Sequence, residues 1–321
     1  MSPSPDGASG SPAGVGPAEV EAAAERIGGR VRETPVIALE PGALGVDAEL
    51  TLKLELLQHT GSFKPRGAFS AMLAADVPAA GVYAASGGNF ALAVAHAAAR
   101  LGHPATIFVP EASPPAKVER LRRGTCEVVV VGALYDDALA VCSERAARAG
   151  GLELHAFDDP LVVAGQGTCA RELDRQAPGL DTVLVAVGGG GLAGGTCAWY
   201  TDRARIVAVE PERAPTLARA RAAGAPVEVE VGGLAADSLG ARRIGAHPWR
   251  ALEAWADESV LVSDESIRAA QRLLWDQVRV AAEPGGATAL AALLSGAYAP
   301  AAGERVGVLV CGANLDPSVL A

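Results

Sequence analysis

The chain has 321 residues and a net charge of −10, because 37 Asp and Glu outnumber 27 Lys and Arg. A protein that binds nucleic-acid phosphates carries the opposite balance, and no run of about 18 uninterrupted apolar residues could span a bilayer. We therefore expect neither nucleic acid nor membrane as a partner. At roughly 150 residues per domain, the length suggests two domains.

Cysteine usage indicates the compartment, and the composition of the first residues indicates a tail. Five dispersed cysteines without a CxxC pair indicate a reducing compartment, and we expect a cytoplasmic protein. Residues 1–17 are rich in Ser, Pro, Gly and Ala and lack a basic start followed by an apolar core. This composition predicts a disordered tail and not a signal peptide.

After the tail, strand-like apolar runs alternate with Ala-rich helical stretches, beginning with a helix over Ala18–Ile27 that ends at two glycines. The expected strands are Leu50–Leu56, Gly81–Ala85, Ala105–Val109, Glu127–Val131, Thr182–Val187, Ile206–Val209, Ser259–Val262 and Val306–Val310. The expected helices are Asn89–Leu101, Tyr135–Ala149, Leu161–Gln176, Gly191–Tyr200, Asp264–Val278 and Gly286–Leu294. This alternation predicts an α/β fold with mostly parallel sheets, in which ligands bind at the carboxyl ends of strands.

Four consecutive glycines, Gly188, Gly189, Gly190 and Gly191, follow the expected strand Thr182–Val187 and open the next helix. Without Cβ atoms, the backbone N–H groups of such a loop can converge on an anion. The helix N-terminus adds about half a positive charge. The run therefore predicts a phosphate-binding loop.

The same segment also fits a dinucleotide fingerprint. Gly189, Gly191 and Gly194 satisfy GxGxxG, and Glu210 ends the next strand about 20 residues further on. An NAD-dependent oxidoreductase is therefore an alternative on this feature alone. The Walker pattern GxxxxGK[ST] is absent from the sequence, so a P-loop NTPase is not supported.

Lysine is rare, since only Lys53, Lys64 and Lys117 occur. Lys64 stands in the segment Gly61–Gly67 at an expected strand-to-helix junction, and the proline that follows it suits the first turn of a helix. The positive end of the helix dipole should lower the pKa of its amine. A lowered pKa suits a Schiff base or a general base.

Two further loops follow expected strands. Ser86, Gly87, Gly88 and Asn89 open a helix, where Ser86 either caps the helix or belongs to a loop that presents N–H groups to a carboxylate. Cys311 follows the last strand. On its own, such a cysteine is most often a small buried residue.

Taken together, these loops resemble the fold-type II pyridoxal-phosphate (PLP) enzymes, and most closely the serine/threonine dehydratase (ammonia-lyase) group. The resemblance covers about Val31 to Pro317. It implies a two-domain, tryptophan synthase β-like α/β fold with PLP as cofactor and a homodimer. The larger domain would comprise residues 18–74 and 151–321. The smaller domain, residues 75–150, would carry the Asn89 loop and close over substrate.

The resemblance also implies roles for single residues. Lys64 resembles the Schiff-base lysine that removes the substrate Cα proton, Phe63 the side chain packed on the cofactor ring, and Asn89 the partner of the ring hydroxyl. The remaining roles are phosphate binding for Gly188, Gly189, Gly190 and Gly191, a place beside the ring for Gly240, the pyridine nitrogen for Cys311, and the substrate carboxylate for Ser86, Gly87 and Gly88 with Asn89.

Cys311 implies a reaction type, because a thiol does not stabilise a protonated pyridinium as Asp does. A weaker electron sink suits β-elimination, and the implied reaction turns L-threonine or L-serine into a 2-oxo acid and ammonia. Gly87 stands where the racemases of the family carry Ser, which favours a dehydratase. Phe90 stands where many relatives have His, so a non-catalytic relative is an alternative, as are a hydroxyaspartate dehydratase and a racemase.

Glu210, Ala214 and Thr216 match a cation site beside the phosphate loop of the family. Relatives that bind a divalent ion have a carboxylate at the third position. Because Thr216 offers a neutral oxygen, the resemblance favours a monovalent ion such as potassium, with an empty loop as the alternative. Few residues follow Cys311, so we expect no appended regulatory domain.

Overall fold

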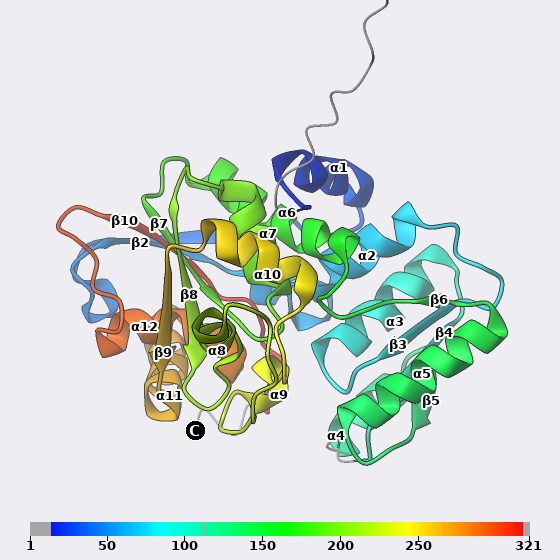
Figure 1. The fold of residues 1–321 in the computed structure, drawn as a ribbon. Helices are drawn as coiled ribbons and strands as arrows, with labels where there is room; N and C mark the ends of the chain where they lie inside the picture. Colours follow the sequence, from blue (N-terminus) through cyan, green and yellow to red (C-terminus); the bar gives the residue numbers. More distant parts are fainter. Residues whose placement is uncertain (1–13, 112, 114, 317–321) are drawn as a thin grey trace, which may run out of the picture.

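The computed structural model describes residues 14–111, 113 and 115–316, and its strands form two sheets (Figure 1). The larger sheet has the order β1-β2-β10-β7-β8-β9, and the smaller one the order β5-β4-β3-β6. The strands are β1 (Val36–Leu39), β2 (Glu49–Lys53), β3 (Val82–Ala85), β4 (Ala105–Val109), β5 (Glu127–Val130), β6 (Leu152–Glu153), β7 (Thr182–Ala186), β8 (Arg205–Pro211), β9 (Glu258–Val262) and β10 (Arg305–Leu309).

Among the described strands, only β1 and β2 pair antiparallel, and every other neighbouring pair is parallel. The predicted α/β fold with mostly parallel sheets is therefore confirmed. The α-helices are α1 (Pro17–Ile27), α2 (Lys64–Ala74), α3 (Asn89–Leu101), α4 (Pro115–Arg122), α5 (Tyr135–Ala149), α6 (Pro160–Gln176), α7 (Gly191–Tyr200), α8 (Thr216–Ala223), α9 (Ala236–Leu239), α10 (Ala246–Trp255), α11 (Asp264–Leu273) and α12 (Pro284–Ser295).

Helices cover both faces of the larger sheet, which is what a parallel sheet requires. Leu184 and Val207 belong to the cluster that packs with α11 and α12, whereas Val183 and Ile206 belong to the cluster that packs with α6, α7 and α10. Successive strand residues point to opposite faces, so both faces of β7 and β8 are apolar. This explains why these strands appear in the sequence as continuous apolar runs.

The smaller sheet is also covered on both faces. Ala84 and Ile107 pack with α2 and α3, while Tyr83 and Phe108 pack with α5. In Figure 1 this sheet and its helices lie to the right of the larger one. β7 and β10 are parallel neighbours and end at the same edge of the larger sheet, and the loop after β3 meets the loop after β10 through a hydrogen bond between Asn89 and Asn314.

Several boundaries differ from the sequence-based expectation. Residues 1–13 of the expected tail lie outside the described residues, but Val15 is only 1% exposed and α1 begins within the expected tail, at Pro17. The expected helix Asp264–Val278 is divided, since a π-helical turn, Leu274–Val278, follows α11. β6 extends the smaller sheet beyond residue 150, and two residues are too few to show a periodicity in the sequence.

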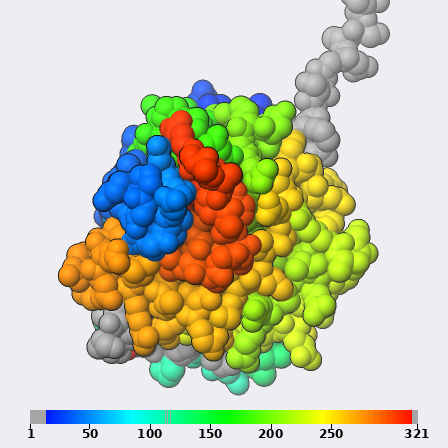
Figure 2. All heavy atoms as spheres, turned by 90° about the vertical axis from the view of Figure 1, so that its left-hand side faces the viewer, coloured from blue at the N-terminus to red at the C-terminus, as the bar shows by residue number. Residues whose placement is uncertain are grey.

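Three 3₁₀ turns complete the described elements: η1 (Ala43–Gly45), η2 (Glu55–Leu57) and η3 (His59–Gly61). Figure 2 shows that the blue segment around β2 lies against the red segment around β10, although the two are far apart in sequence. None of the helices in the described part of the chain is long and apolar enough to cross a membrane.

Candidate active site

Lys64 is the first residue of α2, and its loop is tied to the end of β10. The Phe63 N–H donates to the Cys311 carbonyl at 3.2 Å, and Ser62 forms an isolated bridge with Gly312. β2 and β10 are parallel neighbours, so the chain leaves both strands at the same edge. The fold thereby brings together two sequence-predicted residues, Lys64 and Cys311, that are far apart in the chain.

The Lys64 amine lies in an apolar environment. Its Nζ donates to the Ala156 carbonyl at 3.1 Å and stands 4.9 Å from the centre of the Phe63 ring and 5.7 Å from that of Phe90. Burial lowers the pKa of Lys64 to about 8, against smaller raising effects of Cys311 and Glu283. The expected direction is confirmed, and burial is its main cause.

The four glycines form the turn between β7 and α7, as predicted. Gly190 has a φ of 91°, a left-handed conformation that favours glycine. A Cβ atom at Gly189 would lie 2.4 Å from the Phe157 ring, so the loop packs against the residue that follows Ala156. No acceptor among the described residues is assigned to the N–H groups of Gly189 or Gly191. A helix N-terminus with free N–H groups can hold a phosphate.

Helix α9 and Gly240 lie between the glycine loop and the loop before α3. A Cβ atom at Gly188 would lie 2.9 Å from the Leu239 Cα, and one at Gly88 would lie 3.6 Å from the Asp237 carbonyl oxygen. The Gly285 N–H donates to Ser238 Oγ at 3.1 Å. The α9 segment therefore touches the glycine loop, the loop before α3 and the start of α12. Gly240 ends α9 so tightly that a Cβ there would lie 1.9 Å from the Ala236 carbonyl oxygen.

Asn89, at the start of α3, is held by two residues of the larger-sheet part. Its Nδ2 donates to Glu283 Oε1 at 2.6 Å, and its Oδ1 accepts from Asn314 Nδ2 at 2.7 Å. Glu283 also accepts from the Asn314 N–H at 3.1 Å. Because Glu283 is 5% exposed, burial raises its pKa to about 7, although the bond from Asn89 works in the opposite direction.

This raised pKa predicts a pH effect on stability. Between its ordinary value of 4.5 and about 7, the folded chain binds a proton that the unfolded chain lacks, so the free energy of unfolding falls as the pH rises. Lys64 contributes only above about 8. In the cofactor-free chain, the melting temperature of the wild type should fall between pH 5 and 8 more than that of Glu283→Gln. Parallel melting curves of the two proteins would contradict the assignment.

The loop before α3 presents small residues. The Gly88 N–H donates to Ser86 Oγ at 3.2 Å, and the N-cap of α3 is Gly88, so Ser86 supports the loop and does not cap the helix itself. A Cβ at Gly87 would lie 2.5 Å from Ser113 Oγ. The N–H groups of Gly87 and Asn89 are assigned no acceptor among the described residues, so a carboxylate could meet them.

Cys311 is 4% exposed, and its Sγ donates to the Gly285 carbonyl at 3.6 Å. Burial, with a smaller contribution from Glu283, raises its pKa to about 12. The side chain is therefore a neutral thiol near pH 7. A neutral thiol fits the role implied for it, which is that of a partner that leaves a pyridine ring unprotonated.

The three residues of the expected cation site lie close together. Thr216 Oγ1 donates to the Gly188 carbonyl at 2.7 Å and lies 3.1 Å from Glu210 Oε1, and the Thr216 N–H donates to the Ala214 carbonyl at 3.1 Å. Glu210 accepts from the first N–H groups of α8, those of residues 217 and 218. No group of three or more His, Cys, Asp and Glu among the described residues could hold a metal ion.

Sequence reasoning missed the segment between β6 and α6. Ala156 accepts from Lys64, Phe157 packs on Gly189, and His155 Nδ1 accepts from the Asp158 N–H at 2.8 Å. These residues act through backbone atoms and ring packing, for which the sequence carries no motif. It also missed the ion pair between Lys117 on α4 and Asp237 on α9.

Comparisons with known proteins identify the family of the chain. A family model described as "Pyridoxal-phosphate dependent enzyme" matches residues 27–312. The chain is 40% identical over 299 residues to a phenylserine dehydratase of Ralstonia pickettii, over 91% of this chain and 90% of that protein. It is 36% identical over 302 residues to an L-threonine ammonia-lyase of Geobacter sulfurreducens, over 92% of this chain and 75% of that protein.

A solved structure gives the same result. Maize serine racemase superposes with a TM-score of 0.88 at 31% identity, and the match covers 95% of each chain. The family match replaces the dinucleotide alternative, and Glu210 accepts from the first N–H groups of α8, so its carboxylate is already occupied. The chain belongs to the pyridoxal-phosphate dependent enzymes of fold type II, and its cofactor is pyridoxal phosphate.

Proposed function

We propose that this protein catalyses the β-elimination of water from L-threonine or L-serine, which yields a 2-oxo acid and ammonia. The observation that carries the proposal is the Lys64 amine, whose pKa burial lowers to about 8. The amine donates to the Ala156 carbonyl. Phe157, the next residue of that segment, packs on the glycine loop. An amine in this state is partly unprotonated near pH 7 and can accept a proton.

The residues that would hold the cofactor fit its chemistry. The free N–H groups of the glycine loop would donate to the phosphate, and Phe63 would pack on one ring face. Asn89 and Cys311 would face the polar groups of the ring. When bound, pyridoxal phosphate supplies a conjugated ring that draws electrons from the substrate Cα. Lys64 would remove the Cα proton, and the β-hydroxyl would leave as water after it takes up a proton from the Lys64 ammonium or from solvent. Water then releases ammonia, so the net reaction needs no oxidant.

Two residues favour elimination over racemisation. Racemisation requires a second base on the opposite face of the Cα, and Gly87 carries no side chain that could exchange a proton. The neutral Cys311 thiol disfavours a long-lived carbanion, so loss of the β-hydroxyl follows proton removal directly. Together they support a dehydratase, even though three of the structural relatives are named racemases.

The substrate side chain is proposed to be uncharged. Lys117 and Arg120 reach the site from α4, but Asp237 already pairs with Lys117, and Asn314 Oδ1 accepts from Arg120 at 2.7 Å. A second substrate carboxylate would have to compete with Asp237 or Asn314 for these cations, at a cost of about 1 kcal/mol or less because both contacts are exposed. This argument disfavours 3-hydroxyaspartate.

L-threo-phenylserine is a second candidate, because a relative with 40% identity is named a phenylserine dehydratase. A panel of L-serine, L-threonine, L-threo-phenylserine and 3-hydroxyaspartate tests the proposal, with ammonia and the 2-oxo acid identified by mass. We expect turnover of L-threonine or L-serine and the lowest kcat/KM for 3-hydroxyaspartate. A chain that binds pyridoxal phosphate but consumes none of the four would be a non-catalytic relative, and the dehydratase proposal would be wrong.

Two further proposals concern closure of the molecule and a cation site. Contacts that link the two sheet parts, such as Asn89–Glu283 and Lys117–Asp237, support closure of the part around residues 75–150 over substrate.

Glu210, Ala214 and Thr216 are proposed to bind a monovalent cation, and replacing potassium by a large organic cation should then lower activity. The homodimer and the cytoplasmic location stay predictions.

A further inference from the structure

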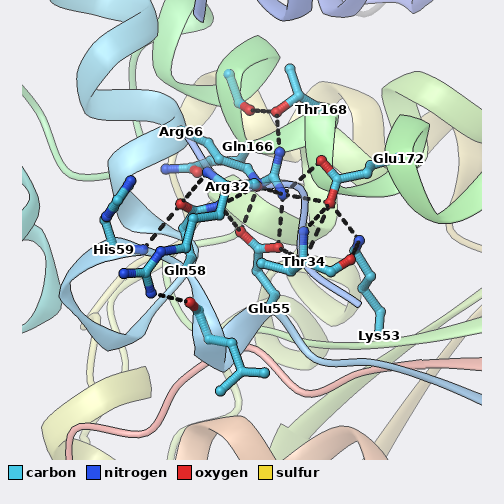
Figure 3. A network of polar contacts seen from close by, with 12 residues as sticks. Arg32, Thr34, Lys53, Glu55, Gln58, His59, Arg66, Gln166, Thr168 and Glu172 are labelled. Carbon is cyan, nitrogen blue, oxygen red and sulfur yellow. Dashed lines mark hydrogen bonds and ion pairs between the residues drawn. The ribbon is translucent and has the colours of Figure 1, made fainter. Parts of the chain in front are cut away.

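A buried network of charges lies behind the lysine loop (Figure 3). Arg66 is 1% exposed, and Lys53 and Glu55 are completely buried. Arg66 Nε donates to Glu55 Oε1 at 2.6 Å, and its Nη2 donates to Glu172 Oε1 at 3.0 Å. Lys53 Nζ donates to the same Glu172 oxygen at 2.5 Å. The two cations and two carboxylates balance, so the network is neutral.

Neutral side chains complete the network. Thr34 Oγ1 donates to Glu55 Oε2 at 2.6 Å, and the Thr34 N–H donates to Glu172 Oε1 at 2.8 Å. Arg66 Nη1 donates to Thr168 Oγ1 at 3.3 Å. A buried charge that loses one partner is strongly destabilised. The side chains of this network are therefore held in one arrangement.

Arg66 and Lys64 are two positions apart on the first turn of α2. At 3.6 residues per turn, such residues point about 200° apart around the helix axis. Arg66 therefore reaches into the network on one side of α2, while Lys64 reaches the Ala156 carbonyl on the other. Whatever fixes Arg66 also fixes the position from which the Lys64 amine emerges.

The acceptor of the Lys64 amine depends on the same network. Thr168, Glu172 and Gln176 lie four residues apart on one face of α6, and all three bind Arg66 or Lys53. The segment that leads into α6 contains Ala156. The two helices also approach closely, since a Cβ at Gly165 would lie 2.7 Å from the Arg66 carbonyl oxygen.

We propose that Arg66, Glu55 and Glu172 are positioning residues, which fix α2 against α6 so that the Lys64 amine stays beside the Ala156 carbonyl and out of water. The proposal rests on Lys64 as the reactive amine of the proposed function. It adds that residues without contact to cofactor or substrate determine the acidity of that amine.

The test uses the cofactor-free full-length chain, checked for folding by circular dichroism. Its amines are labelled with acetic anhydride at a series of pH values, and mass spectrometry follows each of the three lysines separately. In Glu172→Gln, the pKa of Lys64 should rise by at least about one unit, which cuts its free-amine fraction at pH 8 about 5-fold. Lys117, whose side chain is 26% exposed, serves as the internal reference for the reagent.

Two more variants serve as a replacement for Glu172→Gln and as a control. If Glu172→Gln does not fold, Lys53→Gln combined with Glu172→Gln removes one charge of each sign and leaves none unpaired, with the same shift expected. The control is Glu304→Gln, which removes the charge and one of the two oxygens of a carboxylate that accepts from Thr182 Oγ1 and from the Ala301 N–H at the other end of β10. It should lower the melting temperature but leave the pKa of Lys64 unchanged.

A folded network variant with an unshifted Lys64 pKa would overturn the proposal, as would an equal shift in Glu304→Gln. The measurement needs no turnover. A failure of the proposed dehydratase activity therefore leaves this result unaffected, and the two can be told apart.

Discussion

Replacing Lys64 by alanine should remove the yellow absorbance of the purified protein and lower ammonia release from its substrate by at least about 10⁴-fold. The first effect follows because the amine that would bond covalently to pyridoxal phosphate is lost. The second follows because the variant also loses the base that takes the Cα proton, and a positioned base alone contributes about 10²- to 10⁴-fold. Absorbance spectra and a coupled 2-oxo acid assay measure the two effects.

Lys117→Ala is the matched control, since it removes the other lysine near the site. Lys117 pairs with Asp237 at the partly exposed junction of α4 and α9. Exposed ion pairs contribute about 1 kcal/mol or less, so this variant should keep its colour and lose roughly 5-fold in kcat/KM at most. If Lys64→Ala remains yellow and active while Lys117→Ala does not, the assignment of the reactive amine is wrong.

Replacing Gly189 by alanine should weaken binding of pyridoxal phosphate by roughly 5- to 150-fold, the effect of about 1–3 kcal/mol of overpacking. The new Cβ would lie 2.4 Å from the Phe157 ring, so either the ring or the loop must move. A moved loop no longer directs its N–H groups at one point. Titration of the cofactor-free protein with pyridoxal phosphate, followed by absorbance, gives the dissociation constant.

The cause of this loss can be separated from a general effect of removing a glycine. Gly232→Ala places its Cβ 3.1 Å from the flexible end of the Arg213 side chain, and it should bind the cofactor as the wild type does. Combining Gly189→Ala with Phe157→Leu makes room for the new methyl group and should recover part of the affinity. Equal affinity in Gly189→Ala and the wild type would show that this loop does not hold the phosphate.

Local signals in the sequence were sufficient for several elements. The bounds of α3, α5 and α7 were predicted as the structure has them. The first two end at Gly102 and Gly150, both in the left-handed conformation that stops a helix. Their Ala-rich sequences and glycine C-caps act within a few residues, which is why they can be read without the fold. Helix α4 has no such signals and was missed.

The chemistry of the site could be predicted from the sequence only in part. The sequence indicated a lowered pKa for Lys64 from its place at a helix start, whereas burial is the main cause. Nothing in the sequence indicated that burial raises the pKa of Glu283 to about 7. Desolvation depends on which side chains surround a group, and these come from strands and helices far apart in the chain.

By itself the sequence determined the α/β class and the glycine turn, and it indicated the lysine that we propose as reactive, because each depends on residue types at short spacing. Only the tertiary structure decided that Ala156 accepts from Lys64, that Phe157 packs on Gly189 and that Arg66 is anchored to Glu55 and Glu172. These contacts arise where parallel strands end at a common edge and helices pack across it. The spacing of residues along the sequence does not tell how far apart two such residues lie in the folded chain.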